Sequence, residues 1–368
     1  MTEPLDIIFC KLLRVALGSS QEIPNKLDEL EWRSILLMAK QQALQGIIYK
    51  SISFLPKDVC PPRTLMMRLS MTAEIIRGQN VLMNQEAVRY TQLFADWGVR
   101  GAILKGPANA RLYPDPLLRQ AGDIDIWIPG GFDKVVLLLM KMGLLSKNYN
   151  LEKNVHHVEF RNEKNIEIEI HHVPARGVIY RNKDFQKLLL TEIEDMTLSP
   201  EGFYSPSIRF ALLMQIAHLQ QHFYSGLGLR QYMDYYMLLT HSTKADREYV
   251  WRYIKKFALG HVCAAVMGLL EMAFGLSREL MLCPPDLKRG MRLYKLAFRG
   301  GNFGKYAPKN SKKEYLLKSW FRERLLSIQW FCFDPFNTVV KELLYWKKTI
   351  SLMPERIRRR KISLSNKG

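Results

Sequence analysis

The chain has 368 residues, of which 48% are hydrophobic and 24% are charged. These values are typical of a globular protein and exclude a disordered or collagen-like chain. No uncharged apolar run reaches about 18 residues, so we expect no transmembrane helix. The acidic, charge-interrupted N-terminus is not expected to be a signal peptide. Five scattered cysteines without CxxC spacing indicate neither a zinc site nor a disulfide framework, and they favour a reducing, cytoplasmic setting.

The formal net charge of +19 is unevenly spread along the chain. Residues 301–368 carry a net charge of +11, and the first 300 residues carry only +8. The most basic stretch contains Arg356, Arg358, Arg359, Arg360 and Lys361. This asymmetry favours an anionic partner at the C-terminus, either nucleic acid, nucleotide or an acidic membrane surface. A solvated basic tail without a partner is the alternative.

The first 97 residues are predicted to be helical. Shorter helices are expected near 5–17 and 30–50. A long helix is expected between the prolines at 61–62 and Gly98, because apolar residues recur there on one helical face and the flanking residues suit a helix start and stop.

Residues 98–200 show a different pattern, typical of a small α/β core. Short β-rich runs alternate with helical ones and end in two strands joined by a polar turn, which predicts a hairpin. The expected strands are 99–104, 124–128, 155–160 and 166–172, and the expected helices are 107–113 and 132–145.

Residues 201–368 are again predicted to be helical. The expected helices are 208–224, 229–241, 246–258, 261–275, 313–331 and 336–350. The fold class is therefore α/β (α+β): a small mixed sheet at 98–200, flanked by helical regions at 1–97 and 201–368.

The main candidate for chemistry is the pair Asp123 and Asp125, at the start of a predicted strand. Residues i and i+2 of a strand share a face, so the two carboxylates should lie side by side. The two negative charges repel each other unless a cation lies between them. Carboxylate oxygen ligands favour Mg²⁺ or Mn²⁺ as that cation. Two solvated aspartates at a strand end are the alternative.

A third carboxylate is expected from the strand at 166–172, where Glu167 and Glu169 share one face. We favour Glu169 as the partner of the aspartates. Three carboxylates can hold two divalent ions, an arrangement that serves phosphoryl and nucleotidyl transfer. The alternative is that both glutamates lie on the solvent-exposed face of an edge strand.

Lys105 and Gly106 lie where the first predicted strand meets a helix. Glycine lets a phosphate approach the backbone, a helix N-terminus attracts anions, and Lys105 adds a positive charge. The spacing is not that of a Walker A motif. Arg119, four residues before Asp123, is a second candidate for neutralising a triphosphate. The alternative is that Arg119 forms an ion pair at the protein surface.

The ordered set LKG, arginine and Asp-hydrophobic-Asp, in GAILKGPANARLYPDPLLRQAGDIDIWI, resembles the DNA polymerase beta-like nucleotidyltransferase superfamily. More narrowly, it resembles a bacterial family of uncharacterised nucleotidyltransferases, over roughly residues 30–240. The resemblance implies metal binding by Asp123, Asp125 and Glu169. It also implies a role near the nucleotide for Arg230. The superfamily usually carries Gly-Ser where this chain has Lys105-Gly106, which leaves phosphate binding to Lys105, backbone amides and Arg119.

Histidines are predicted near the same site. The family pattern points to His156 or His157, to the run Glu169-Ile170-His171, and to a helical histidine at 218 or 222. Neighbours on a strand point to opposite faces, so only one of each adjacent pair should face the site. Likewise, one of His218 and His222 is expected to face the cleft, although their i, i+4 spacing is also that of metal ligands. Arg230 and Asp234, also i and i+4, suggest an ion pair within one helix.

Together these features predict an enzyme that transfers a nucleoside monophosphate from a nucleoside triphosphate, with ATP as the expected nucleotide, to an acceptor. The sequence does not distinguish among a small molecule, a glycan, a protein and RNA as the acceptor. Glu169 would also orient or deprotonate the acceptor hydroxyl. The alternatives are a DxD glycosyltransferase that uses a sugar nucleotide, and a non-catalytic protein that binds nucleic acid or membrane on a degenerate transferase fold.

Overall fold

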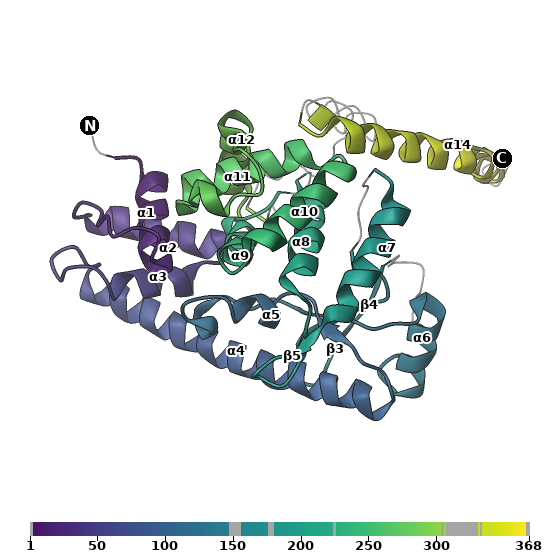
Figure 1. The fold of residues 1–368 in the computed structure, drawn as a ribbon, viewed down its shortest axis with the longest axis horizontal. Coiled ribbons are helices and arrows are strands. Elements are labelled where there is room, and N and C mark those ends of the chain that lie inside the picture. Colours follow the sequence, from purple (N-terminus) through teal and green to yellow (C-terminus); the bar gives the residue numbers. More distant parts are fainter. Residues whose placement is uncertain are drawn as a thin grey trace.

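The computed structural model describes most of the chain. Side chains are described up to residue 351, with the exception of residue 348. The described ranges are 3–146, 156–175, 180–223, 226–302, 305–306, 330–331 and 333–365. Across them, a small four-stranded mixed sheet lies among helices from both ends of the sequence (Figure 1). This confirms the predicted fold class. Among the described residues, no helix combines the length and apolarity needed to cross a membrane.

The helices before the sheet follow the predicted order. They are α1 (Leu5–Leu17), α2 (Glu29–Gln42), α3 (Gln45–Ile52) and α4 (Arg63–Asp96). The single helix expected near 30–50 is two helices. Ala43 adopts a left-handed conformation with φ of 55° and ends α2, so α3 starts in a new direction.

The helices within and after the sheet include two that the sequence pattern did not predict, α7 and α12. The α-helices in the described residues of this part are α5 (Pro107–Ala110), α6 (Gly131–Lys141), α7 (Asn182–Glu192), α8 (Ile208–His222), α9 (Leu229–Thr240), α10 (Lys244–Lys256), α11 (Gly260–Phe274), α12 (Leu287–Gly300) and α14 (Pro335–Ser365). The predicted helix at 313–331 lies almost wholly outside the described residues.

The sheet has the strand order β1-β2-β4-β3. Its strands are β1 (Ala102–Ile103), β2 (Ile124–Trp127), β3 (His157–Arg161) and β4 (Glu167–His171). β2 and β4 run parallel, and the two outer pairings, β1 with β2 and β3 with β4, are antiparallel. The predicted hairpin of β3 and β4 is thus confirmed. Because side chains alternate along a strand, the sheet has one apolar face and one polar face.

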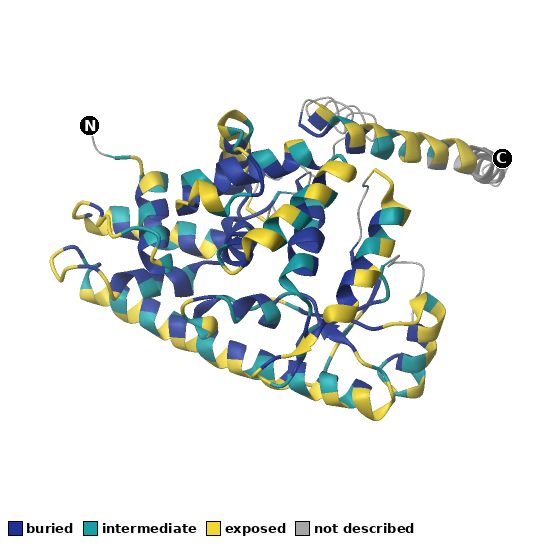
Figure 2. Cartoon of the chain, viewed as in Figure 1, coloured by how far each residue is buried: buried dark blue, intermediate teal, exposed yellow. Residues whose placement is uncertain are grey.

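The apolar face of the sheet packs against α4 and α6. Ile124, Ile126, Ile168 and Ile170 are fully buried there, in a core that includes Tyr90 of α4. The first half of α4 belongs instead to the helical core. The 34-residue α4 therefore connects the two cores, with its outer side exposed along its length (Figure 2).

A second, larger core is formed by helices from both ends of the chain. It includes Phe9 of α1, Trp32 of α2, Phe210 of α8 and Phe274 of α11. The N-terminal helices α1–α3 therefore pack with the C-terminal helices, and this body covers the polar face of the sheet through α8. The predicted divisions at residues 97 and 200 stay predictions.

Candidate active site

The parallel strands β2 and β4 place two of the predicted carboxylates directly opposite each other. Asp125 and Glu169 are register partners. Asp125 has no exposed surface, and the Glu169 side chain is 15% exposed. Glu167, on the same face, forms an ion pair of 2.7 Å with Arg161 near the surface. The position of Glu169 beside Asp125 thus favours it over Glu167 as the third carboxylate.

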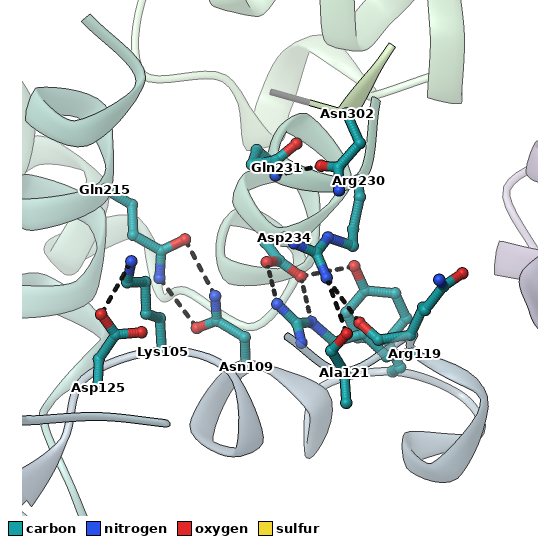
Figure 3. Close-up of polar contacts among 12 residues, drawn as sticks. Lys105, Asn109, Arg119, Ala121, Asp125, Gln215, Arg230, Gln231, Asp234 and Asn302 are labelled. Atoms are coloured by element: carbon teal, nitrogen blue, oxygen red, sulfur yellow. Dashed lines mark hydrogen bonds and ion pairs between the residues drawn. The ribbon is translucent and has the colours of Figure 1, made fainter. Parts of the chain in front are cut away.

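Lys105 reaches the carboxylate pair from the end of β1. Its Nζ lies 3.0 Å from Oδ1 of Asp125 (Figure 3). The next residue, Gly106, has a φ of 64°, and a Cβ there would meet the backbone oxygen of Asp123 at 3.0 Å. Only glycine allows this close approach without strain, and the turn sets Lys105 against β2.

The anion-attracting helix N-terminus expected after Gly106 is not formed to a useful length. α5 has only four residues. A helix dipole is a sum over aligned peptide units, so one turn contributes little. The positive charge at this end of the sheet therefore comes from Lys105.

A cavity of about 330 Å³ opens over the polar face of the sheet. Lys105, Asp123 and Glu169 line it from the sheet side, and Met214 and Gln221 line it from α8. Imidazole side chains from three segments of the chain also line this cavity. The histidines in its lining are His156, His157, His171, His218 and His222. Asp123 is half-buried, and Asp125 lies directly behind the lining.

More histidines face the cavity than the sequence predicted. His156 and His157 both line it, because His156 precedes β3 in a bend and escapes the alternation of the strand. His218 and His222 also both line it, and their ring centroids are 4.5 Å apart. The expectation that one member of each of these pairs packs away was wrong. It holds for the third pair, where His171 faces the cavity and His172 packs against Phe132.

The charges around Asp125 keep it ionised. Burial alone would raise its pKa, but the positive charge of Lys105 and the hydrogen bond to His171 hold the pKa well below its usual range. The pKa of Lys105 is raised, against the effect of burial, by Asp125, Asp123 and Glu169. Lys105 and Asp125 are therefore a charged pair at neutral pH.

The histidines divide into two electrostatic groups. Burial opposes the charged form of His171, but its hydrogen bonds to Asp125 and Glu169 raise its pKa. Burial lowers the pKa of His157, and burial together with the charge of Lys105 lowers that of His218 well below the usual value. His157 and His218 are thus neutral bases at pH 7.

Two buried atoms at the centre of this cluster have no hydrogen-bond partner in the part of the chain that the structure describes. They are Oδ2 of Asp125 and Nδ1 of His171. An unsatisfied buried carboxylate oxygen is costly, and a cation is one way to satisfy it. Asp125, Glu169 and His171 offer ligand atoms within 4.8 Å of one another. The donor set beside the cavity therefore fits a divalent ion.

Arg119 lies deep in the protein rather than in the lining of the cavity. Its guanidinium forms two hydrogen bonds to Asp234 of α9, of 2.6 and 2.7 Å, and Tyr113 donates a third to the same carboxylate (Figure 3). Arg119 and Asp234 are 6% and 5% exposed. The direct contact of Arg119 is with Asp234, not with the carboxylates at the cavity, although Asp123 adds to Asp234 in raising the pKa of Arg119 against the effect of burial.

Arg230 contacts the chain just before the Asp123–Asp125 segment. Its Nη1 donates to the backbone oxygens of Gln120 at 2.8 Å and of Ala121 at 3.5 Å. The predicted ion pair between Arg230 and Asp234 is not formed as a direct contact, because Asp234 is held by Arg119, but the charge of Arg230 adds to that of Arg119 in lowering the pKa of Asp234. Arg230 therefore holds the entry to β2 and does not line the cavity.

Some residues that build the site were not singled out in the sequence. Asn109 of α5 and Gln215 of α8 form a reciprocal pair of amide hydrogen bonds, of 2.9 and 3.1 Å, which fixes α8 over the sheet (Figure 3). No sequence pattern marks such a pair. Tyr113 was also missed. The alternation that selects Glu169 does place His171 on the same face.

The fold and the site together define a nucleotidyltransferase-like protein, with paired acidic strands and a lysine at the edge of a small mixed sheet. Residues 28–275 match the family described as "Uncharacterised nucleotidyltransferase", and the chain belongs to this family. The resemblance inferred from the ordered motifs is thereby confirmed.

A comparison with solved structures found an antigenic nucleotidyltransferase-like protein from Paracoccidioides brasiliensis. It is 15% identical, with a TM-score of 0.36 over 56% of this chain and 94% of that chain. At this score no equivalence of residues follows. A comparison with curated proteins gave no significant match.

Proposed function

We propose that the protein is a metal-dependent nucleotidyltransferase that transfers a nucleoside monophosphate from a nucleoside triphosphate to an acceptor and releases pyrophosphate. The observation that carries this proposal is the register of Asp125 against Glu169 beside a cavity that Lys105 and Asp123 also line. Family membership supports the transferase class. The divalent ion, the nucleotide and the acceptor are parts of the proposal.

Asp123, Asp125 and Glu169 would hold Mg²⁺ or Mn²⁺. The unpartnered Oδ2 of Asp125 supports this assignment, because a buried carboxylate oxygen otherwise lacks a donor. When bound, such ions stabilise the charge that develops on phosphate oxygens. Glu169, at the cavity wall, would in addition orient the acceptor hydroxyl.

Lys105 would supply positive charge to the phosphates of the nucleotide, ATP in the simplest case. Lys105 both contacts Asp125 and lines the cavity, so its ammonium can contact an anion there without leaving the site. We assign Arg119 and Arg230 to positioning, since both fasten the segment that leads into β2. Direct contact of these two arginines with a triphosphate stays a prediction.

The test uses each of the four nucleoside triphosphates labelled at the α-phosphate, with Mg²⁺ or Mn²⁺ and a lysate of the natural host. Label should be transferred by wild type and by Glu167→Gln, but not by Asp125→Asn or Glu169→Gln. Glu167 is the matched control because it shares the strand and face of Glu169 but pairs with Arg161 away from the cavity.

Three results would count against the proposal. Absence of both transfer and metal-dependent triphosphate binding would overturn it. Preferential binding of a sugar nucleotide would favour a glycosyltransferase. Ligand binding that survives Asp125→Asn, without any transfer, would indicate a non-catalytic binding protein.

The basic C-terminus is proposed to bind an anionic partner. α14 runs to Ser365 along the top of the molecule in the view of Figure 1, with β3 and β4 below it. The side chains of residues 356–361 lie outside the described part. Removal of residues 352–368 should abolish salt-sensitive binding to RNA or to anionic vesicles and leave nucleotide binding intact. Equal binding by the shortened chain would contradict this.

A further inference from the structure

Beyond the carboxylates, the cavity contains a run of closely spaced atoms of the kinds that ligate metals. Nε2 of His156 lies 2.9 Å from Nδ1 of His157, which lies 3.4 Å from Oε2 of Glu169. The same Oε2 lies 3.3 Å from Nε2 of His171. Nε2 of His171 in turn lies 3.0 Å from Oδ1 of Asp125. Five possible ligand atoms thus follow one another at contact distance.

These separations match the edges of a metal coordination shell. Nitrogen and oxygen ligands lie about 2.0–2.1 Å from a tetrahedral Zn²⁺, which puts neighbouring ligand atoms about 3.3 Å apart. The nitrogens of His156, His157 and His171 all lie within 4.8 Å of one another. Each of the ring centroids is 4.1 to 5.6 Å from the other two.

The types of ligand indicate the class of ion. Imidazole suits Zn²⁺ and its transition-metal neighbours, whereas Mg²⁺ takes oxygen ligands and keeps water. At one end of the run lies the carboxylate of Asp125, and at the other lie the imidazoles of His156 and His157, with Glu169 between His157 and His171. The two ends therefore differ in which cation they prefer.

The support around the imidazole end suits a fixed site. β3 and β4 are paired through His157 and His171, so both rings are carried on one rigid ladder. The two side chains are 11% and 7% exposed. Nε2 of His171 contacts both Glu169 and Asp125, and its Nδ1 is buried with no hydrogen-bond partner among the described residues, so one nitrogen of the ring is left unsatisfied.

We propose that His156, His157 and His171, with Glu169 as a shared carboxylate, form a site for a transition-metal ion of the Zn²⁺ class. The site lies next to the Asp123–Asp125 carboxylates and is distinct from them in ligand type. It does not rest on nucleotidyl transfer, because metal binding can be measured without nucleotide or acceptor.

The test uses Co²⁺ as a spectroscopic probe for Zn²⁺ on the full chain, after treatment with a chelator. Wild type should bind Co²⁺ with the intense visible bands of a tetrahedral, nitrogen-containing site, and Zn²⁺ should displace it. A large excess of Mg²⁺ should leave the bands unchanged. Loss of an outer-sphere partner already weakens metal binding by about 10–100-fold, so His157→Ala and His171→Asn should weaken it by about 100-fold or more.

Two matched controls separate this site from its surroundings. His172→Ala removes the adjacent imidazole, which faces Phe132 instead of the cavity, and should leave the Co²⁺ affinity within about twofold of wild type. Asp123→Ala removes a carboxylate from the lining of the cavity and should preserve the bands. Circular dichroism checks that each variant is folded. If His157→Ala is not folded, His156→Gln at the edge of the cluster replaces it.

The proposal is overturned if folded wild type binds no Co²⁺, or if Mg²⁺ displaces the ion. It is also overturned if Asp123→Ala abolishes the bands while His157→Ala and His156→Gln leave them unchanged. The last two results would assign the ion to the carboxylates and leave the transferase proposal standing. Conversely, failure of nucleotidyl transfer with intact imidazole-dependent binding would remove only the transferase proposal.

Discussion

The segment that connects β1 to β2 supplies the cation of two ion pairs, Lys105 with Asp125 and Arg119 with Asp234, and these pairs are built differently (Figure 3). Arg119 and Asp234 form two parallel hydrogen bonds, and Tyr113 adds a third, so both carboxylate oxygens have donors. Lys105 contacts only one oxygen of Asp125, and the other has no partner among the described residues. Both carboxylate oxygens of the first pair are satisfied, and we call it the closed pair. The second pair leaves one carboxylate oxygen able to bind a ligand, and we call it the open pair.

The difference shows how a buried charge can serve either structure or function. A fully satisfied pair holds two segments together, here α9 and the loop before β2. An incompletely satisfied carboxylate at a cavity costs stability, and such a cost is typical of a site that awaits a ligand. The same fold therefore contains a structural pair and a candidate functional pair, and variants should separate them.

The largest expected effect is on activity, at the open pair. Asp125→Asn should lower the rate of nucleotidyl transfer by at least about 10³-fold, or about 4 kcal/mol, because it removes the central oxygen ligand. The variant should stay folded, since Lys105 lines the cavity and can be hydrated there. Single-turnover transfer and urea unfolding measure the two properties. A variant that is much less stable to urea but keeps full specific activity when folded would reverse the comparison.

The closed pair should show the opposite behaviour. Asp234→Ala leaves the guanidinium of Arg119 buried without its partner, so the free energy of unfolding should fall by about 3–5 kcal/mol. The double variant Arg119→Met/Asp234→Leu replaces the pair with apolar side chains and should recover much of this loss. Urea unfolding at pH 7 measures both. If the free energy of unfolding of the single variant falls by less than about 1 kcal/mol, the pair does not hold α9 to the loop before β2.

A smaller effect is expected from the third donor to Asp234. Tyr113→Phe removes one hydrogen bond to a charged acceptor and should lower the free energy of unfolding by about 1.5–2 kcal/mol. Tyr235→Phe is the matched control. Tyr235 is also fully buried, on the same helix as Asp234, but its hydroxyl has no hydrogen-bond partner in the described residues. Equal losses from the two variants would mean that the Tyr113 bond contributes nothing specific.

Much of this site followed from the alternation of side chains along a strand. That rule placed Asp123 with Asp125 and Glu167 with Glu169. The ordered motifs correctly indicated the family. The register of β2 against β4 was not predictable, since it depends on a parallel pairing between residues 44 positions apart in the sequence. Only the register distinguishes Glu169, which faces Asp125, from Glu167, which pairs with Arg161.

The errors have the same origin in tertiary contacts. The i, i+4 spacing of Arg230 and Asp234 is a real helical neighbourhood, but Arg119 offers a bidentate partner that Arg230 does not. His156 was assigned by strand alternation, yet the strand begins one residue later. A local pattern gives each residue's neighbours along its own element, whereas the choice among partners is made by the elements that pack against it.

The smallest predicted effect concerns pH and the closed pair. Burial opposes the charged form of Asp234, but the charge of Arg119 lowers its pKa below the usual value. A carboxyl with a lowered pKa in the folded state contributes stability above its unfolded pKa, about 3.9, and loses that contribution as the pH falls further. The difference in unfolding free energy between wild type and Asp234→Asn should thus stay constant from pH 7 to 5.

Below about pH 4 the same difference should shrink, by up to about 1.3 kcal/mol at pH 3. Urea unfolding of both proteins at matched pH values measures it, and the subtraction cancels the carboxyls that the two proteins share. A difference that already shrinks between pH 7 and 5 would mean that Asp234 takes up a proton near neutrality. The Arg119 pair would then be a proton-binding site, and the contrast with the open pair of Lys105 and Asp125 would fail.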